Sequence, residues 1–271
     1  MQEPVSWQPS ESSERYLGRL TAPDLRNRLS SDSILCLPIG ACEQHGPHLP
    51  LNTDTILADR FAFQVAARWH KEHDIWLLPP IPYGLSREHG WSAGTVSLTV
   101  RVFSELLLGL CDQIVASLAA KNLIIINGHG GNRGILEALI YEMEDRFGLN
   151  ICVTHPTALA DVHSGSSLPE VHGGMSETSV MLAIAPNEVR LDHIPSDYAP
   201  DAFRSGAIRD AIISRGTTWP WRSNDPSIAT LGIIGDARSA NAELGFRIVE
   251  SSLVEYGRVL SRLAGRRQHG Q

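Results

Sequence analysis

The chain has 271 residues, and its hydrophobic fraction of 42% suits a globular protein with a sizeable core. The formal net charge of -7 argues against nucleic acid or an anionic membrane as a main partner, because both attract clustered Lys and Arg. The four cysteines are scattered without a C-x-x-C pair, and no apolar run is long enough to span a membrane, so we expect a cytoplasmic protein with reduced thiols.

Apolar periodicity divides the chain into alternating strands and helices. It predicts strands at 33–38, 75–78, 123–126 and 151–154. It predicts helices at 21–28, 54–73, 99–120, 133–147, 176–184 and 240–263. In the helix expected at 99–120, the apolar stripe consists of Val102, Leu106, Leu110, Ile114 and Leu118. Residues 186–236 show too little periodicity to be assigned.

This alternation predicts an α/β fold with three layers, α/β/α, around a mostly parallel central sheet. We expect one domain over residues 1–271, with frayed ends at 1–15 and 265–271. Open sheets of this kind bind their ligands beyond the carboxyl ends of the strands. The segments that follow the predicted strands are therefore the places to search for a functional site.

The segment after the first predicted strand carries two carboxylates and two imidazoles within a dozen residues. Glu43 and His45 are two positions apart, so in extended chain their side chains point the same way. Asp54 falls at the start of the next predicted helix and has two oxygens with which to bridge two ions. We interpret these three residues as metal ligands.

Two later strand-helix junctions carry the same residue types. His129 lies in the glycine-rich turn after the third predicted strand, and Glu177 lies at the start of the helix expected at 176–184. Together with the first segment they give three carboxylates and two imidazoles, a set suited to two ions of zinc, manganese or iron rather than to calcium.

Charge and position suggest how such a site would act. The three carboxylates leave one positive charge of two divalent ions, which a bridging hydroxide would neutralise and which makes hydrolysis the expected chemistry. His172, five residues before Glu177, is predicted to be the proton shuttle to the leaving nitrogen. Glu88, His89 and Asn132 are interpreted as substrate contacts.

Each feature has a plainer explanation. A Glu-x-His pair is common on solvated loops, and Gly128-His129-Gly130-Gly131 taken alone is as typical of a tight turn as of a site. Glu88 and His89 can equally be exposed loop residues. What favours the metal site is that three separate junctions each present a ligand-type side chain.

The turn after the third predicted strand also allows a function of another class. A nucleotide-binding module would hold phosphate at the N-terminus of the following helix. The glycine pattern opposes this alternative, because the third glycine of G-x-G-x-x-G falls on Arg133. An inactive relative of an enzyme is a third alternative, which the complete ligand set disfavours.

In combination, the motifs at 43–50, 53–54, 127–132 and 172–179 resemble the creatininase superfamily, and 232–236 is also similar to it. The resemblance implies a metal-dependent amidohydrolase on a three-layer fold with a parallel sheet, commonly homo-oligomeric and in some members hexameric. That family includes creatinine amidohydrolase, a formamide hydrolase acting on a pyrimidine nucleotide, and the peptidase of mycofactocin maturation.

Carried over to this chain, the resemblance implies that Glu43 and His45 bind different ions and that Asp54 bridges the two ions. It also implies that His129 completes the ligand set of one ion. It also makes His172 a catalytic histidine. Creatininase carries a second glutamate where this chain has Gly131, and Glu177 is the expected replacement. This departure disfavours creatinine as the substrate.

The expected function is therefore hydrolysis of a C–N bond in a cyclic amide or formamide. The alternative within the family is a mycofactocin-type peptidase that releases a C-terminal dipeptide.

Overall fold

The computed structural model describes residues 14–200, 202–214 and 216–266. Residues 1–13 and 267–271, most of the ends expected to fray, lie outside these ranges. Four residues expected to fray, 14, 15, 265 and 266, lie within them. Arg15 pairs with Asp74 at 2.8 Å, and the last helix continues to Gly265.

Four parallel strands form the central sheet, in the order β2-β1-β3-β4. Their bounds are β1 (Ile34–Ile39), β2 (Ile75–Leu77), β3 (Asn122–Asn127) and β4 (Asn150–Thr154). β1 pairs with β3 over its whole length, so both strands end at the same level, with Ile39 opposite Asn127. The segments that leave these two central strands therefore start side by side.

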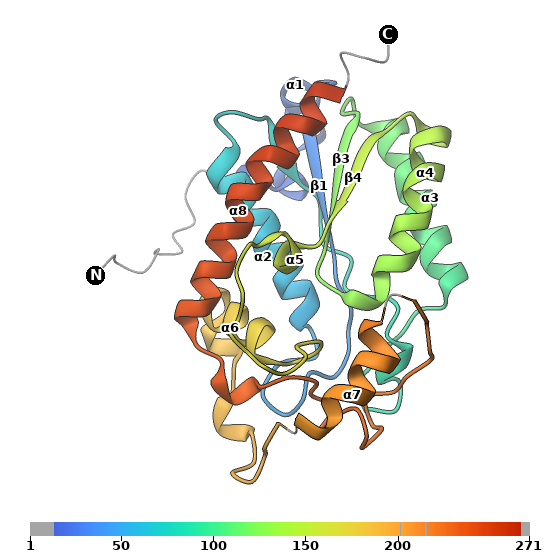
Figure 1. The fold of residues 1–271 in the computed structure, drawn as a ribbon. Coiled ribbons are helices and arrows are strands. Elements are labelled where there is room, and N and C mark those ends of the chain that lie inside the picture. The colour runs from blue at the N-terminus through green and yellow to red at the C-terminus, as the bar shows by residue number, and fades with distance from the viewer. Residues whose placement is uncertain (1–13, 201, 215, 267–271) are drawn as a thin grey trace.

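Helices cover both faces of the sheet (Figure 1). One face packs against α2 (Thr53–Trp69), α6 (Met175–Ile184) and α8 (Ala242–Gly265). The other packs against α3 (Val100–Ser117) and α4 (Arg133–Phe147), with α1 (Ala22–Arg28) beside them. Every residue of β1 is buried, because alternate side chains enter opposite clusters. The predicted three-layer α/β fold is confirmed.

Helix starts follow the capping chemistry of the sequence. Thr21, Thr99 and Asn241 precede α1, α3 and α8, and each side chain accepts a hydrogen bond from a backbone N–H in the first turn. The helix predicted at 133–147 has the same bounds in the structure. It ends before Gly148, whose φ of 61° is the left-handed conformation that glycine favours.

The buried face of α3 differs from the predicted stripe. The helix buries Phe103, Leu107, Cys111 and Ile114, whereas Val102 and Leu106 are 47% and 38% exposed. α3 carries apolar residues on more than one face, so periodicity alone did not select the face. Packing against the sheet decided it.

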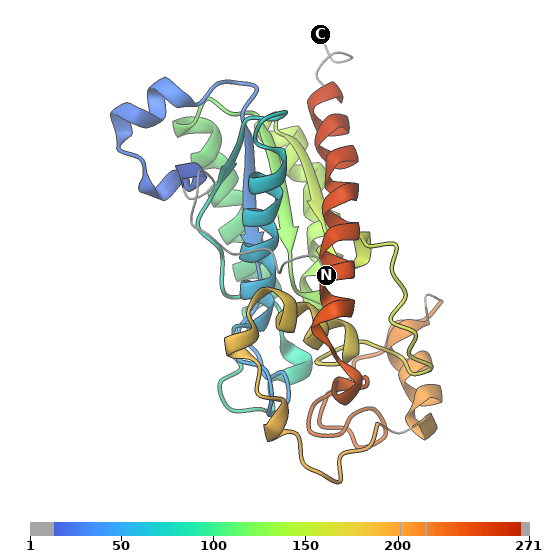
Figure 2. The same ribbon diagram turned by 90° about the vertical axis from the view of Figure 1, so that its left-hand side faces the viewer.

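The region that the sequence left unassigned forms short elements beyond the carboxyl ends of the strands (Figure 2). They include α7 (Ser205–Ile208) and single helical turns at Pro186–Glu188, Leu191–His193, Ala202–Arg204 and Arg209–Ile213, and a further turn, Ala237–Ser239, follows directly. Further single turns are Leu17–Arg19, Arg87–His89, Gly130–Asn132 and α5 (Pro156–Leu159). Within the described ranges, no helix has the length and apolar character needed to cross a membrane.

Candidate metal centre

The candidate site combines two strand ends with two helix starts. Glu43 and His45 lie in the segment after β1, and His129 lies after β3. Asp54 and Glu177 lie in the first turns of α2 and α6, where the helix dipole favours carboxylates. The structure therefore brings together all five residues that the sequence predicts as metal ligands.

The described residues form three overlapping sets of potential ligands; one is Glu43, His45 and His172, and the other two share Asp54. Of these two, Glu43, Asp54 and His129 form the first set, and His45, Asp54 and Glu177 the second; in each, the potential ligand atoms lie within 4.8 Å of one another. His129 Nδ1 is 3.3 Å from Glu43 Oε1 and 3.1 Å from Asp54 Oδ2. His45 Nε2 is 3.2 Å from Asp54 Oδ1 and 3.7 Å from Glu177 Oε1. This arrangement can hold two ions with Asp54 between them.

Backbone carbonyls decide which nitrogen of each histidine faces the carboxylates. His129 Nε2 is 2.7 Å from the Leu85 carbonyl oxygen, and His45 Nδ1 is 3.1 Å from that of Glu43. A carbonyl oxygen only accepts hydrogen bonds, so these nitrogens donate and the opposite nitrogens face the carboxylates. Metal-binding histidines usually have such a partner for their second nitrogen.

Buried carboxylate oxygens without donors also indicate a cation site. Across the described residues, both oxygens of Glu43 and Oδ2 of Asp54 are buried and have no hydrogen-bond partner. Burying ionised oxygens without compensation is costly. A divalent ion with mixed oxygen and nitrogen ligands would satisfy all three atoms. The residues present therefore fit the predicted pair of divalent ions.

The same carboxylates shift the pKa values of the two histidines. Burial opposes the charged ring, but Asp54 and Glu177 raise the pKa of His45 well above its ordinary value. Burial is likewise outweighed at His129, where Glu43 and Asp54 raise the pKa. Each ring therefore holds a proton against the carboxylates, and a metal ion must displace that proton to bind.

His172 and His89 are stacked beside Glu43, with ring centroids 3.9 Å apart. His172 Nε2 donates to the Gln44 carbonyl oxygen at 2.7 Å, so Nδ1 faces the site, 3.6 Å from Glu43 Oε1. Burial lowers the pKa of both rings, and His45 adds to this effect, so both rings are neutral near pH 7. His172 therefore turns Nδ1 toward the cluster, and its role as proton shuttle stays a prediction.

Two of the predicted substrate contacts lie next to each other but differ in exposure. The Glu88 side chain is 18% exposed, and its Oε1 is 4.0 Å from His129 Nε2, at the rim of the cluster. His89 is 1% exposed and lies against His172. His89 therefore lies behind the site histidine, and substrate contact by Glu88 stays a prediction.

Asn132, the third predicted substrate contact, is buried. Its amide oxygen accepts from the Leu85 N–H at 2.9 Å. Its amide nitrogen donates to the Gly40 carbonyl and to the Asn127 side chain, each at 3.1 Å. These bonds join the segments after β1 and β3, so the structure gives Asn132 a bracing role and argues against substrate contact.

Gln44 and Ser223 support the histidines, and the sequence analysis singles out neither. Gln44 Nε2 is 2.9 Å from His89 Nδ1 and 3.1 Å from the Gly232 carbonyl oxygen. Ser223 Oγ is 2.7 Å from the same His89 nitrogen. The position of Gln44 between Glu43 and His45 was an available signal. Ser223 lies in the unassigned region and carried none.

Comparison with known proteins agrees with this geometry. The sequence model of the creatininase family, described as creatinine amidohydrolase, matches residues 18–260. A mycofactocin precursor peptide peptidase from Mycobacterium ulcerans (strain Agy99) is 35% identical over 242 residues, covering 86% of this chain and 85% of that protein. A creatinine amidohydrolase from Pseudomonas putida is 30% identical over 255 residues, covering 87% and 92%.

Solved creatininase structures share the fold of this chain. A solved structure of a creatininase with Mn superposes with a TM-score of 0.76 at 24% identity, covering 93% of this chain and 99% of that chain. The family model matches most of the chain, and both curated relatives are at least 30% identical over most of their length. The chain therefore belongs to the creatininase family.

Proposed function

We propose that the protein is a metal-dependent amidohydrolase that cleaves a C–N bond of a small cyclic amide, a formamide or a short peptide. The observation that carries the proposal is the cluster itself. Two ligand sets share Asp54, two ring nitrogens face carboxylates, and buried carboxylate oxygens have no donor among the described residues. The family membership supports the same reaction class.

Glu43, Asp54 and His129 would hold one divalent ion, and His45, Asp54 and Glu177 the other. When bound, such ions lower the pKa of water to about 7 and polarise a carbonyl group. Manganese, zinc or iron all suit this donor set. A manganese centre has support from the creatininase with Mn that shares the fold.

His172 is proposed to move the proton to the departing nitrogen. Its Nε2–H is held by the Gln44 carbonyl, which leaves Nδ1 facing the cluster. Because burial keeps the ring neutral, Nδ1 can take a proton during attack and return it to the leaving group. Glu177 orders the same loop, since its Oε2 accepts from the Gly173 N–H at 2.6 Å.

Glu88 is proposed to contact the substrate. It is the carboxylate at the rim of the cluster that belongs to none of the ligand sets. An ionised carboxylate there would accept a hydrogen bond from an amide or amine N–H of the substrate. Both a lactam and a peptide carry such a group.

The substrate has two candidate classes. Gly131, where creatininase carries a glutamate, disfavours creatinine itself. The peptidase alternative has its own support, because the mycofactocin precursor peptide peptidase is 35% identical over 86% of this chain. The homo-oligomer and the cytoplasmic location remain predictions, and the exposed Val100, Val102 and Leu106 of α3 offer a surface for a second copy.

The test begins with elemental analysis of protein purified without added metal. The same preparation is then assayed against creatinine and other lactams, formamides, and peptides with a free carboxyl terminus. We expect bound divalent metal, hydrolysis of one of these classes, and loss of the activity after chelation. A Glu43→Gln variant is expected to bind less metal and to be inactive.

Retained nucleotide without metal would instead support the nucleotide-binding alternative. Bound metal without hydrolysis of any class would contradict the proposed reaction.

A further inference from the structure

We propose that Glu170 is a positioning residue of this site, which clamps the loop bearing His172 and Glu177 to the segment at 232–236. The proposal rests on the proposed function, because it assigns Glu170 a part in holding the proposed proton shuttle and a proposed metal ligand in register. Neither the motifs nor the ligand sets include Glu170.

The loop needs an anchor because of its two glycines. Gly173 and Gly174 separate His172 from the helix that carries Glu177, and Gly173 has a φ of 60°. Glycine loses more backbone freedom on ordering than any other residue. Backbone preference alone therefore does not fix the relative position of His172 and Glu177, and side-chain bonds must do so, one of which runs from the Gly173 N–H to Glu177 Oε2 at 2.6 Å.

Glu170 spans this flexible joint with two hydrogen bonds to backbone. Its Oε2 accepts from the N–H of Met175, the first residue of α6, at 2.5 Å. Its Oε1 accepts from the N–H of Asp236 at 3.0 Å. The negative charge also lies at the N-terminus of α6, where the helix dipole favours it.

Next to this carboxylate, the backbone of Val171 and His172 pairs with the 232–236 segment. The N–H groups of Val171 and His172 donate to the Ile234 carbonyl at 2.9 and 3.1 Å. The Ile234 N–H donates back to the His172 carbonyl at 2.8 Å. Glu170 thus joins the start of α6 to Asp236 at one end of a short ladder that contains the site histidine.

Two glycines make room for the carboxylate. A Cβ atom on Gly235 would lie 2.5 Å from Glu170 Oε2, and one on Gly174 would lie closer still. Gly174 has a φ of -85°, which any residue can adopt, so the Glu170 carboxylate and the nearby Gly235 are what exclude a side chain there. The lack of side chains at Gly174 and Gly235 therefore leaves the space that the Glu170 carboxylate fills.

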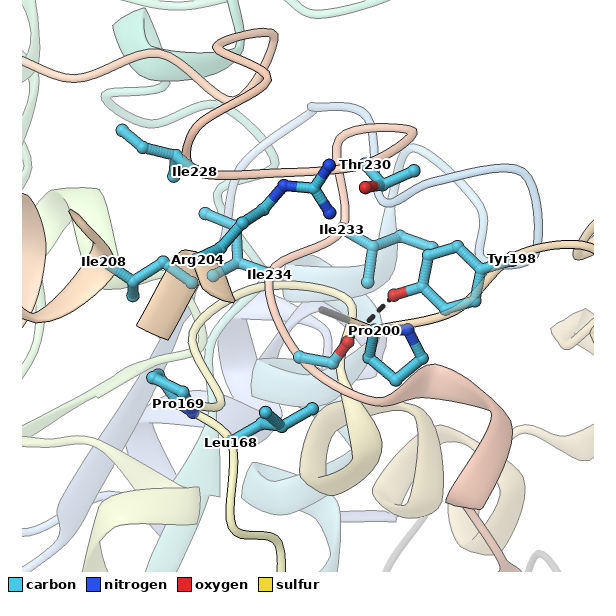
Figure 3. A pocket seen from close by; sticks show the side chains of 11 residues that line it. Leu168, Pro169, Tyr198, Pro200, Arg204, Ile208, Ile228, Thr230, Ile233 and Ile234 are labelled. Carbon is cyan, nitrogen blue, oxygen red and sulfur yellow. Dashed lines mark hydrogen bonds between the residues drawn. The ribbon is translucent and has the colours of Figure 1, made fainter. Parts of the chain in front are cut away.

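The outer side of the 232–236 segment is held separately. Figure 3 shows Tyr198 pointing its hydroxyl at this segment, and the hydroxyl donates to the Gly235 carbonyl at 2.8 Å. Leu168, Pro169 and Ile234 line the same small cavity. The Tyr198 hydroxyl makes no hydrogen bond to Val171, His172 or Ile234 among the bonds described, so its removal provides a matched control.

The first test is the Glu170→Gln variant. The amide keeps the shape but points an N–H₂ group at one of the two backbone donors, so one bond is lost. Changes to residues that orient metal ligands typically cost about 10- to 100-fold in metal affinity or activity. We expect a loss of about 10-fold or more in Mn²⁺ affinity by calorimetry, and a similar loss in kcat at saturating Mn²⁺ with KM nearly unchanged.

Two further variants separate positioning from general destabilisation. Gly174→Ala should reproduce the losses, because its methyl group displaces the carboxylate, and the double variant should be less than additive. Tyr198→Phe should lower Tm while it leaves Mn²⁺ affinity and kcat at the wild-type level. If Glu170→Gln does not fold, the Mn²⁺ affinity and kcat of Gly174→Ala test the proposal in its place.

The possible failures can be told apart. A Glu170→Gln variant with reduced Tm but wild-type Mn²⁺ affinity and kcat would overturn the clamp and leave the proposed function standing. A wild-type protein that binds Mn²⁺ but hydrolyses no amide would overturn the proposed function. The Mn²⁺ affinities of the wild type and the variants would still show whether Glu170 clamps the loop. A wild-type protein that binds no divalent metal would overturn both.

Discussion

At the residue scale, the site depends on which nitrogen each histidine turns toward the carboxylates. His129 presents Nδ1 and His45 presents Nε2, in each case because the other nitrogen donates to a backbone carbonyl. The carbonyl of Leu85 therefore belongs to the site as much as any side chain. An imidazole fixed in this way loses little entropy when it binds a metal ion.

Replacing His129 with Ala is expected to lower kcat/KM by at least about 100-fold, because the first ligand set loses its only nitrogen and two carboxylates face each other. Metal content should fall, while far-UV circular dichroism stays near that of the wild type. His193→Ala, which removes an exposed imidazole, serves as the control. Full activity of His129→Ala would refute the ligand assignment.

At the element scale, the site depends on how closely the turn after β3 approaches the start of α2. A Cβ atom on Gly128 would lie 3.1 Å from the carbonyl carbon of Asp54, and nearer still to its oxygen. The absence of a side chain at Gly128 therefore lets His129 reach Asp54. Two elements separated by more than seventy residues meet backbone to backbone at this point.

Gly128→Ala is expected to push the turn away from α2, at a cost of about 1–3 kcal/mol in unfolding free energy. Because His129 then moves away from Asp54, metal affinity should fall as well. The matched control is Gly109→Ala, an exposed position within α3 where a Cβ meets open space. That change should stabilise the protein by up to about 1 kcal/mol. Urea unfolding measures the change in unfolding free energy, and calorimetric metal titration measures the change in metal affinity. Equal effects of Gly128→Ala and Gly109→Ala would contradict the proposed importance of the close approach at Gly128.

At the scale of the whole molecule, the cluster couples stability to pH and to metal. Without metal, the raised pKa values of His45 and His129 mean that the unfolded chain releases these protons first as pH rises. Unfolding free energy should therefore be highest near pH 6.5, the ordinary histidine value, and should fall as pH rises through the raised values. Histidines with lowered pKa, such as His48 at about 4, lower the unfolding free energy only below about pH 6.5, where the unfolded chain protonates them and the folded protein does not.

Bound metal is expected to reverse this trend, because ions bind the neutral rings and gain affinity as pH rises. At a free metal concentration of 100 times Kd, stabilisation should reach about 2.7 kcal/mol. Urea unfolding from pH 6 to 9, with chelator or with Mn²⁺, measures both effects. A chelated protein that became more stable between pH 7 and 9 would contradict the protonation scheme.

Local patterns in the amino-acid sequence were enough to predict the layers and most of the site's residue types. Leu123 to Ile126 is apolar without interruption, which is the local signature of a strand covered on both faces, and the structure makes it β3. The five predicted ligands were recognisable because each follows a strand or begins a helix. Such signals depend on neighbours within a few residues, so periodicity and spacing reveal them.

What each side chain faces, in contrast, depends on how the elements pack in three dimensions. Packing buried Phe103 and Leu107 instead of Val102 and Leu106, and it placed Ser223 against His89 and Ile234 against His172. These contacts join positions far apart in the chain, in segments with no periodicity of their own. Their partners are selected by packing over the end of the sheet, which no local pattern records.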